Sequence, residues 1–170
     1  MTRAFRSGEI AGVIWRPLRK HCDHRGWLSE LYREDEVPPE YHPVMGYISE
    51  TLPGVVRGPH EHYEQTDYFC FFGPSNFRLY LWDNRPQSET YGVRQEAVVG
   101  ADNPTAVIVP PGVVHAYQNI GPAPGWVLNL ANRLYKGPGR QEPVDEIRHE
   151  TRPDSPFTLD LNERLAHVPS

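Results

Sequence analysis

The sequence predicts an all-β protein, a closed sandwich or barrel of the jelly-roll type, and three observations carry this expectation. Short runs rich in β-branched and aromatic residues recur along the chain. The 14 Gly and 18 Pro among 170 residues stand between these runs, as turn residues do. No long window repeats apolar residues at helical spacing, and a short stretch near 160–167 is the best helical candidate.

The expected strands are evenly spaced and need no crossover helices, which favours a closed β architecture. As a set they are rich in β-branched and aromatic residues and are bounded by Gly, Pro, Asn and Asp. In order they are 12–17 (GVIWRP), 27–33 (WLSELYR), 44–51 (VMGYISET), 67–72 (DYFCFF), 76–82 (NFRLYLW), 92–99 (GVRQEAVV), 105–110 (TAVIVP), 113–119 (VVHAYQN) and 125–131 (GWVLNLA). Residues 1–170 suit one domain, with the polar tail 136–170 wrapping the barrel.

Composition excludes several classes of function. The net charge of −5 is modest and the basic residues are scattered, so we expect neither nucleic acid nor a membrane surface as partner. Cys22 and Cys70 lie far apart and form no CxxC pair, which favours reduced thiols in the cytoplasm. The N-terminus lacks the apolar core of a signal peptide, and no apolar run approaches the roughly 18 residues that cross a bilayer.

The stretch GVVRGPHEHYEQTDYF, residues 54–69, carries two histidines two positions apart. On an extended strand His60 and His62 project to one face, about 7 Å apart, whereas Arg57 at an odd offset should face away. Such a pair can bind a metal, line a pocket or lie in solvent. A second stretch, PPGVVHAYQN at 110–119, turns at Pro-Pro-Gly and presents His115 from a strand, which favours a shared pocket.

These two stretches resemble the two signature segments of the cupin superfamily, whose fold is a jelly-roll barrel with short peripheral helical segments. The matching residues are Gly54, His60, His62 and Gly73 in the first segment, and Pro110, Gly112, His115 and Asn119 in the second. In metal-binding cupins an acidic ligand follows the second histidine by four or five residues, where this chain has Thr66 and Asp67. A divalent-metal site of three histidines, alone or with Asp67 or Glu64, stays open.

Most of the chain is also similar to the dTDP-4-dehydrorhamnose 3,5-epimerase family. The segments DHRGWLSELY (23–32), GVVRGPH (54–60) and VPPGVVHAY (109–117) carry this resemblance through their order and spacing. The RGxHxH pattern also resembles the related 3,4-ketoisomerases of dTDP-4-keto-6-deoxyhexoses, in which both histidines are thought to work.

The resemblance implies roles for individual residues. His60 would be the base that removes a proton next to the ketone, since histidine titrates near neutral pH. Asp145 or Glu150, in VDEIRHE at 144–150, would orient it. The substrate contacts implied are Arg25, Glu30, Arg57 and His115, with the arginines suited to phosphate oxygens.

Two positions depart from the family's pattern. Counting forward from His115 puts Leu128 where the family has its proton-donating tyrosine, and Thr66 aligns with a catalytic lysine. Three alternatives follow. Another group donates the proton, with Tyr117, His62 and Tyr68 as the candidates; or only a single isomerisation occurs; or the chemistry has been replaced or lost.

The resemblance therefore implies a homodimer that epimerises or ketoisomerises a nucleotide-linked 4-keto-6-deoxy sugar without a cofactor, and the cysteine usage favours the cytoplasm. A metal-dependent cupin enzyme, using His60, His62, Asp67 and His115, is one alternative. A cupin that binds sugar nucleotides without catalysis is another, and the missing tyrosine and lysine motivate it.

Overall fold

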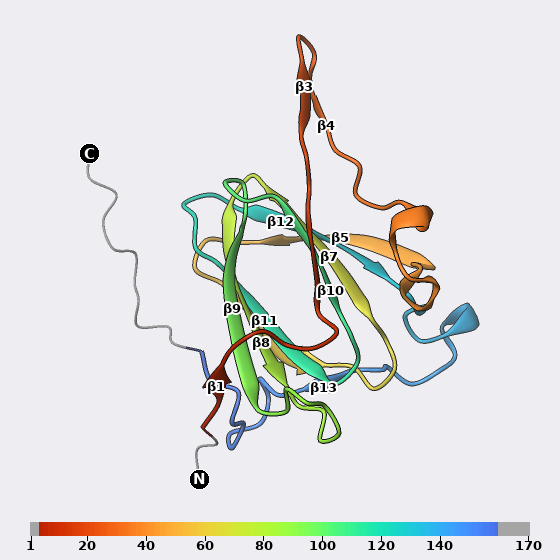
Figure 1. Ribbon diagram of the computed structural model, residues 1–170, viewed down its shortest axis with the longest axis vertical. Coiled ribbons are helices and arrows are strands. Elements are labelled where there is room, and N and C mark those ends of the chain that lie inside the picture. The colour runs from red at the N-terminus through yellow and green to blue at the C-terminus, as the bar shows by residue number, and fades with distance from the viewer. Residues whose placement is uncertain (1–3, 160–170) are drawn as a thin grey trace.

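The structure, a computed structural model, describes residues 4–159, and strands dominate it (Figure 1). In chain order the elements are β1 Arg6–Ser7, β2 Ile14–Pro17, β3 His21–Asp23, β4 Gly26–Leu28, η1 Glu34–Glu36, η2 Pro39–Tyr41, β5 Met45–Thr51, β6 Val56–Glu61, β7 Asp67–Gly73, β8 Asn76–Asp83, β9 Val93–Gly100, β10 Thr105–Val109, β11 Val113–Asn119, β12 Gly125–Ala131, η3 Pro138–Arg140 and β13 Ile147–Arg148. The elements η1, η2 and η3 are single 3-10 turns. The helix expected near 160–167 lies outside the described residues.

Two sheets form the body of the molecule. One has six strands in the order β1-β9-β8-β11-β6-β13, and the other has five in the order β2-β10-β7-β12-β5. All pairs within them are antiparallel except β1 with β9. Two mainly antiparallel sheets in which all neighbouring strands except β8 and β9 are non-consecutive in sequence have the arrangement of a jelly roll. The all-β prediction is confirmed.

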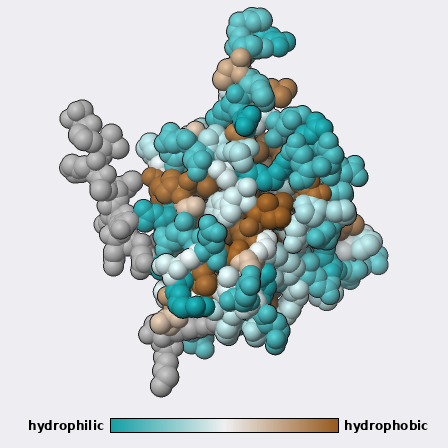
Figure 2. All heavy atoms as spheres, viewed as in Figure 1, coloured by the Kyte–Doolittle hydropathy of each residue, from teal (hydrophilic) through white to brown (hydrophobic). Residues whose placement is uncertain are grey.

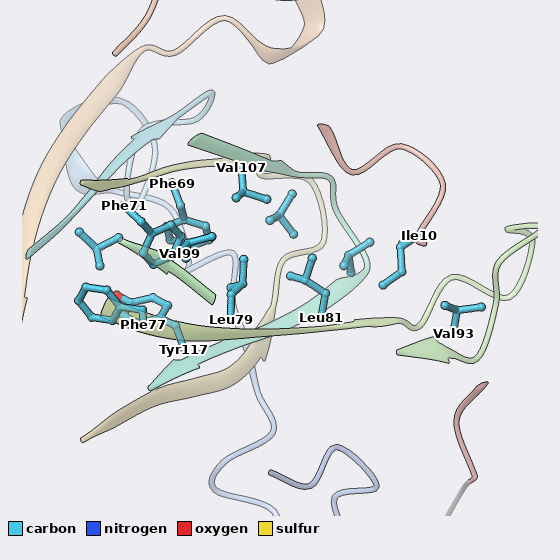
Figure 3. Close-up of a cluster of buried hydrophobic side chains, with 13 residues drawn as sticks. Ile10, Phe69, Phe71, Phe77, Leu79, Leu81, Val93, Val99, Val107 and Tyr117 are labelled. Atoms are coloured by element: carbon cyan, nitrogen blue, oxygen red, sulfur yellow. The ribbon is translucent and has the colours of Figure 1, made fainter. Parts of the chain in front are cut away.

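The main core lies between the two sheets (Figure 3). Alternate residues of each strand enter it, because successive side chains point to opposite faces of a sheet. On β7 the inward residues Phe69 and Phe71 pack against Phe77 and Tyr117 of the facing sheet. This aromatic layer closes the barrel interior beneath the site described below.

The outer faces of both sheets are also covered. Tyr68 and Cys70 on β7 point outward and pack with Leu128 and Leu31. On the other sheet Tyr80, Trp82, Val114 and Ala116 pack against Phe157 of the C-terminal segment. The view in Figure 2 shows hydrophobic residues gathered in the middle of the body with hydrophilic surface around them.

The segment 27–33 is where the predicted strands fail most clearly. Only Gly26–Leu28 is extended, as β4, and it pairs with β3 in a hairpin that projects from the body (Figure 1). The chain then crosses the outer face of the five-stranded sheet, where the Leu31 carbonyl accepts a hydrogen bond from the Tyr68 hydroxyl at 2.7 Å. Leu31 and Tyr32 therefore pack against the outer face of the sheet rather than pair as a strand. In residues 4–159 no helix is long and apolar enough to cross a membrane.

Candidate active site

A cavity of about 840 Å³ opens at one end of the barrel. Its walls come from β5 of the five-stranded sheet, from β6 and β11 of the six-stranded sheet, and from the segment 133–150. This volume lies within the range of roughly 300–1,000 Å³ found for small-molecule sites.

Three histidines from two neighbouring strands meet at this cavity. His60 and His62 lie on β6, and His115 lies opposite His60 in the register of β11 with β6. One ring nitrogen of each lies within 4.8 Å of the others, and the rings of His60 and His115 are 4.4 Å apart between centroids. The two segments that suggested a shared pocket are thus adjacent strands.

Asp67, the first residue of β7, is the buried anion of the site. Its Oδ2 atom lies 3.1 Å from Nε2 of both His62 and His115. Its Oδ1 atom accepts hydrogen bonds from Gln65 Nε2 at 2.8 Å and from Asn129 Nδ2 at 2.7 Å. The carboxylate is therefore held by four polar groups, as a buried charge requires.

His62 and Asp67 form a charged pair. Burial opposes ionisation of both groups, but their mutual attraction and hydrogen bonding outweigh it. The pKa of His62 rises to about 9 and that of Asp67 falls well below its usual range. The Nδ1–H of His62 donates to the Asp145 carbonyl, which fixes the ring from its other side. At neutral pH His62 is a cation.

His60 has the opposite protonation state. Burial, together with the neighbouring His115 and His62, lowers the pKa of His60 to about 2. The ring is therefore neutral at cellular pH, the form that accepts a proton. Its Nε2 atom lies 3.9 Å from Glu146 Oε1, and Glu146 is the carboxylate nearest to it in the described part of the chain. Sequence reasoning missed Glu146, although it lies in the VDEIRHE segment.

Arg57 lines the cavity, so the expectation that it faces away from the histidines was wrong. His115 and Tyr117 are two positions apart on β11, whereas their partners on β6, His60 and Arg57, are three positions apart. The extra residue is a β-bulge, which reverses the alternation of side chains along β6. Arg57 donates to Thr51 Oγ1 at 2.9 Å and to the Glu50 carbonyl at 2.7 Å.

The C-terminal segment closes one side of the cavity. The Asp145 carboxylate does not contact His60; it accepts hydrogen bonds from the backbone N–H groups of Tyr63, Glu64 and Gln65 at 2.7–3.1 Å. Glu150 lies on the cavity wall. Asp145 therefore fixes the turn after β6 and, through its carbonyl, orients His62.

A buried side-chain contact between Glu61 and His149 fastens this segment to the back of β6. Between His60 and His62, Glu61 points away from the cavity and its Oε1 atom lies 2.8 Å from His149 Nε2. Asn84 Nδ2 donates to the same oxygen at 2.9 Å. Directly beside this pair β13 runs antiparallel to β6. These contacts hold Glu146 next to His60.

Two of the predicted substrate contacts lie away from the cavity of their own chain. Arg25, at the turn of the projecting hairpin, has a side chain that is 77% exposed and pairs with Asp23. Glu30 lies 3.5 Å from Arg33. Neither residue lines the cavity.

The predicted proton donors lie in three different environments. The hydroxyl of Tyr68 is on the outer face of its sheet, where Arg16 donates to it at 2.6 Å. Tyr117 reaches the cavity floor, 3.4 Å from Ser49 Oγ, and is otherwise packed among the core phenylalanines. His62 lies beside His60, as described above.

Of the two positions that depart from the family's pattern, Leu128 faces outward and Thr66 is buried. Leu128 packs with the outer cluster of the five-stranded sheet, and the next residue, Asn129, faces the interior. Thr66 is buried, and its backbone N–H donates to Asn132. Leu128 therefore lies on the outer face of β12, away from the cavity. The ungapped count from His115 selects it because that count ignores the turn between β11 and β12.

The same three histidines offer nitrogen ligands to a transition-metal ion. Asp67, the acidic candidate, accepts hydrogen bonds from Gln65 and Asn129 and lies 3.1 Å from Nε2 of His62 and of His115. Glu64 instead pairs with Arg133. The described residues thus support a histidine cluster with a hydrogen-bonded carboxylate behind it.

Comparison with known proteins agrees with this architecture. Residues 7–137 match the family described as dTDP-4-dehydrorhamnose 3,5-epimerase. The chain is 34% identical to the spore coat polysaccharide biosynthesis protein SpsL of Bacillus subtilis over 126 residues, covering 74% of this chain and 82% of that one. It is 37% identical to the probable low-salt glycan biosynthesis epimerase Agl13 of Haloferax volcanii over 128 residues, covering 74% and 81%.

Solved structures share the fold. A dTDP sugar isomerase from Desulfovibrio desulfuricans superposes with a TM-score of 0.74 at 26% identity, covering 88% of this chain and 91% of that one. The 3'-monoepimerase ChmJ of Streptomyces bikiniensis, solved with dTDP-quinovose, gives a TM-score of 0.67 at 22% identity over 84% and 72% of the two chains. These neighbours have the cupin jelly roll.

Proposed function

Because the chain belongs to the dTDP-4-dehydrorhamnose 3,5-epimerase family, we propose that it inverts a carbon next to the ketone of a dTDP-linked 4-keto-6-deoxy sugar. The family consists of sugar epimerases that act without a cofactor. The observation that carries the proposal is the placement of His60, His62 and Arg57 around one cavity, with the two imidazole rings 6.0 Å apart between centroids.

In this mechanism His60 removes the proton from C3 or C5 of the sugar, where the 4-ketone makes the C–H bond acidic. Negative charge then develops on the ketone oxygen. The His62 cation and the Arg57 guanidinium at the same cavity stabilise that charge, and both are positioned before substrate binds. Glu146 beside His60 stabilises the imidazolium that forms.

Ketoisomerisation of the same class of substrate is the second candidate. The presence of His62 beside His60 favours it, because a second titratable ring can move a proton between the ketone oxygen and the neighbouring carbon. The two reactions give different products from one enolate, so product analysis separates them.

Incubation with a dTDP-4-keto-6-deoxyhexose in deuterated water tests the proposal. We expect solvent deuterium at C3 or C5, and a loss of about 10²–10⁴-fold in the rate with His60→Asn. Protein treated with a chelator should retain the wild-type rate. Binding of dTDP without any exchange by the wild-type protein would contradict the proposal and support the binding protein instead.

We further propose that the enzyme is a cytoplasmic homodimer. The hairpin β3–β4 projects with Trp27 and Leu28 more than half exposed, and β5, an edge strand, exposes Ile48. A second copy that covers these side chains would also bring Arg25 and Glu30 of one protomer toward its partner. Cys22 on the exposed hairpin and the buried Cys70 are both free thiols, which suits a reducing compartment.

A further inference from the structure

Inversion of a carbon next to a ketone needs two groups on opposite faces of the substrate. One removes the proton, and the other returns a proton from the opposite side. His60 stands on β6 of the six-stranded sheet, so the second group must come from the facing wall of the cavity. In the described residues that wall is formed mainly by β5 of the five-stranded sheet.

We propose that Tyr47, on β5, is the catalytic acid that returns the proton on the face opposite His60. This inference rests on the proposed function. Tyr47 lines the same cavity as His60 and Arg57, and it comes from the other sheet. A substrate bound between the two sheets would have the imidazole on one side and the phenol on the other.

The hydroxyl of Tyr47 is fixed by Asn129, its cross-strand partner on β12. Asn129 Oδ1 accepts the backbone N–H of Tyr68 at 3.0 Å, which settles the orientation of the amide because a backbone N–H can only donate. The Nδ2 group then donates to Tyr47 Oη at 3.0 Å and to Asp67 Oδ1 at 2.7 Å. The phenol oxygen therefore accepts a hydrogen bond, and its own proton is left to point into the cavity.

This arrangement also accounts for the tyrosine that β12 lacks. The interior position on β12 is Asn129, not Leu128, and the phenol reaches that place from the neighbouring strand. One hydrogen-bonded chain then joins Tyr47 through Asn129 to Asp67 and His62. The Asn129 N–H stabilises the phenolate that forms when the proton leaves.

The other phenols at the cavity are placed less well. Tyr117 rises from β11, next to the strand of His60, and is only 5% exposed among Phe69, Phe71 and Phe77. Tyr135 lies on the exposed loop after β12. Tyr47 is 49% exposed, so a substrate in the cavity can reach its hydroxyl. Partial desolvation at the cavity wall, followed by the charge of Asp67, raises the pKa of Tyr47 to about 12, so that the group is protonated across the working range of pH.

The proton balance is complete without any further reactant. His60 takes the C–H proton, and the Tyr47 O–H bond breaks as a new C–H bond forms on the other face. His60 then releases its proton to water, and the tyrosinate takes one from water. Each turnover therefore exchanges one substrate hydrogen with solvent.

The test is Tyr47→Phe, which removes only the hydroxyl. We expect inversion to fall by about 10²–10⁴-fold while His60 still exchanges the substrate hydrogen for deuterium with retained configuration. The affinity for dTDP should be unchanged. Tyr63→Phe, the same change at a hydroxyl exposed on the surface, should behave as wild type.

The outcomes separate this inference from the proposed function. Inversion by Tyr47→Phe at the wild-type rate would overturn the assignment of the acid, and a specific loss in Tyr117→Phe would give that role to Tyr117. Absence of both exchange and inversion in the wild-type protein would instead overturn the proposed function. Equal loss of exchange and inversion in Tyr47→Phe, with weakened dTDP binding, would make Tyr47 a binding residue and also contradict the inference.

Discussion

At the scale of single residues, the site depends on two histidines in one strand that differ in charge. Both rings are largely buried, and burial favours the neutral form of each. Only His62 has a carboxylate at hydrogen-bond distance, 3.1 Å away, whereas the acid nearest His60 is 3.9 Å away. The position of Asp67 therefore decides which histidine is the cation and which is neutral.

The pH dependence of activity follows from this pair. The pKa of His62 is raised to about 9, so the cation is present at lower pH and is lost as the pH rises through about 9. We expect kcat/KM to decline on the alkaline side of that value. Asp67→Asn removes the attraction that raises the pKa, and the alkaline limb should move to lower pH.

A pH–rate profile of both proteins measures this effect. The same substitution should also remove stability that is complete below the unfolded pKa of about 6.5 and disappears as the pH rises through about 9. An alkaline limb at the same pH in both proteins would contradict a role for Asp67 in setting the charge of His62.

At the scale of elements, the bulge in β6 brings Arg57 and His60 to one cavity. Gly58 occupies the bulge with φ of +84°, and a Cβ there would lie 2.5 Å from the His115 carbonyl oxygen. Glycine is required for both the backbone conformation and the close approach of β11. The spacing of the catalytic side chains therefore depends on one residue without a side chain.

Gly58→Ala should lower the free energy of unfolding by about 2 kcal/mol or more, through strain at positive φ and overlap with β11. Activity should fall as well, because β6 and β11 carry His60 and His115. Denaturant unfolding measures the loss. Gly54→Ala is the matched control: its φ is +76°, yet a Cβ there meets nothing within 4 Å, so only the backbone cost of about 1 kcal/mol applies. Equal destabilisation of the two variants would argue against the close approach.

At the scale of the whole molecule, the two sheets supply opposite walls of the cavity. The proposed base stands on one sheet and the proposed acid on the other, so the separation of the sheets sets the distance between them. The hairpin β3–β4 belongs to neither large sheet and projects from the body (Figure 1). Its apolar side chains Trp27 and Leu28 are more than half exposed in a single chain.

This exposed hairpin predicts that the working enzyme is larger than one chain. Sedimentation velocity should give the mass of a dimer, because covering Trp27, Leu28 and Ile48 removes apolar surface from water. Trp27→Asp should shift the equilibrium toward the monomer and lower activity, since Arg25 and Glu30 would no longer reach a partner. A fully active monomer would contradict the dimer.

Much of the fold could be predicted from the sequence. Strands with β-branched and aromatic runs, such as β8 and β10, were located within one or two residues because their pattern matches a buried strand. The segment 27–33 has a similar composition but packs across a sheet, so its local pattern could not distinguish it from a strand. The strand β13 has only two residues, which is too short for any pattern to predict.

The candidate site was predictable in part for a similar reason. His60, His62 and His115 carry their signal in short motifs, and the structure places them within reach of one another. Glu146 and Tyr47 carry no such signal, since a glutamate in a charged tail and a tyrosine in a strand are common. Their importance depends on which residues stand opposite them.

By itself the sequence determined the all-β architecture, the histidine segments and the resemblance to sugar epimerases, because these depend on residue type and local spacing. Only the tertiary structure decided that Arg57 faces the cavity. It also decided that Asp145 fixes a turn while Glu146 approaches His60. On β12 it placed Asn129, bonded to Tyr47, where Leu128 was expected. The physical reason is that bulges, turns and strand neighbours set which face a side chain occupies, and none of these follows from periodicity along a single strand.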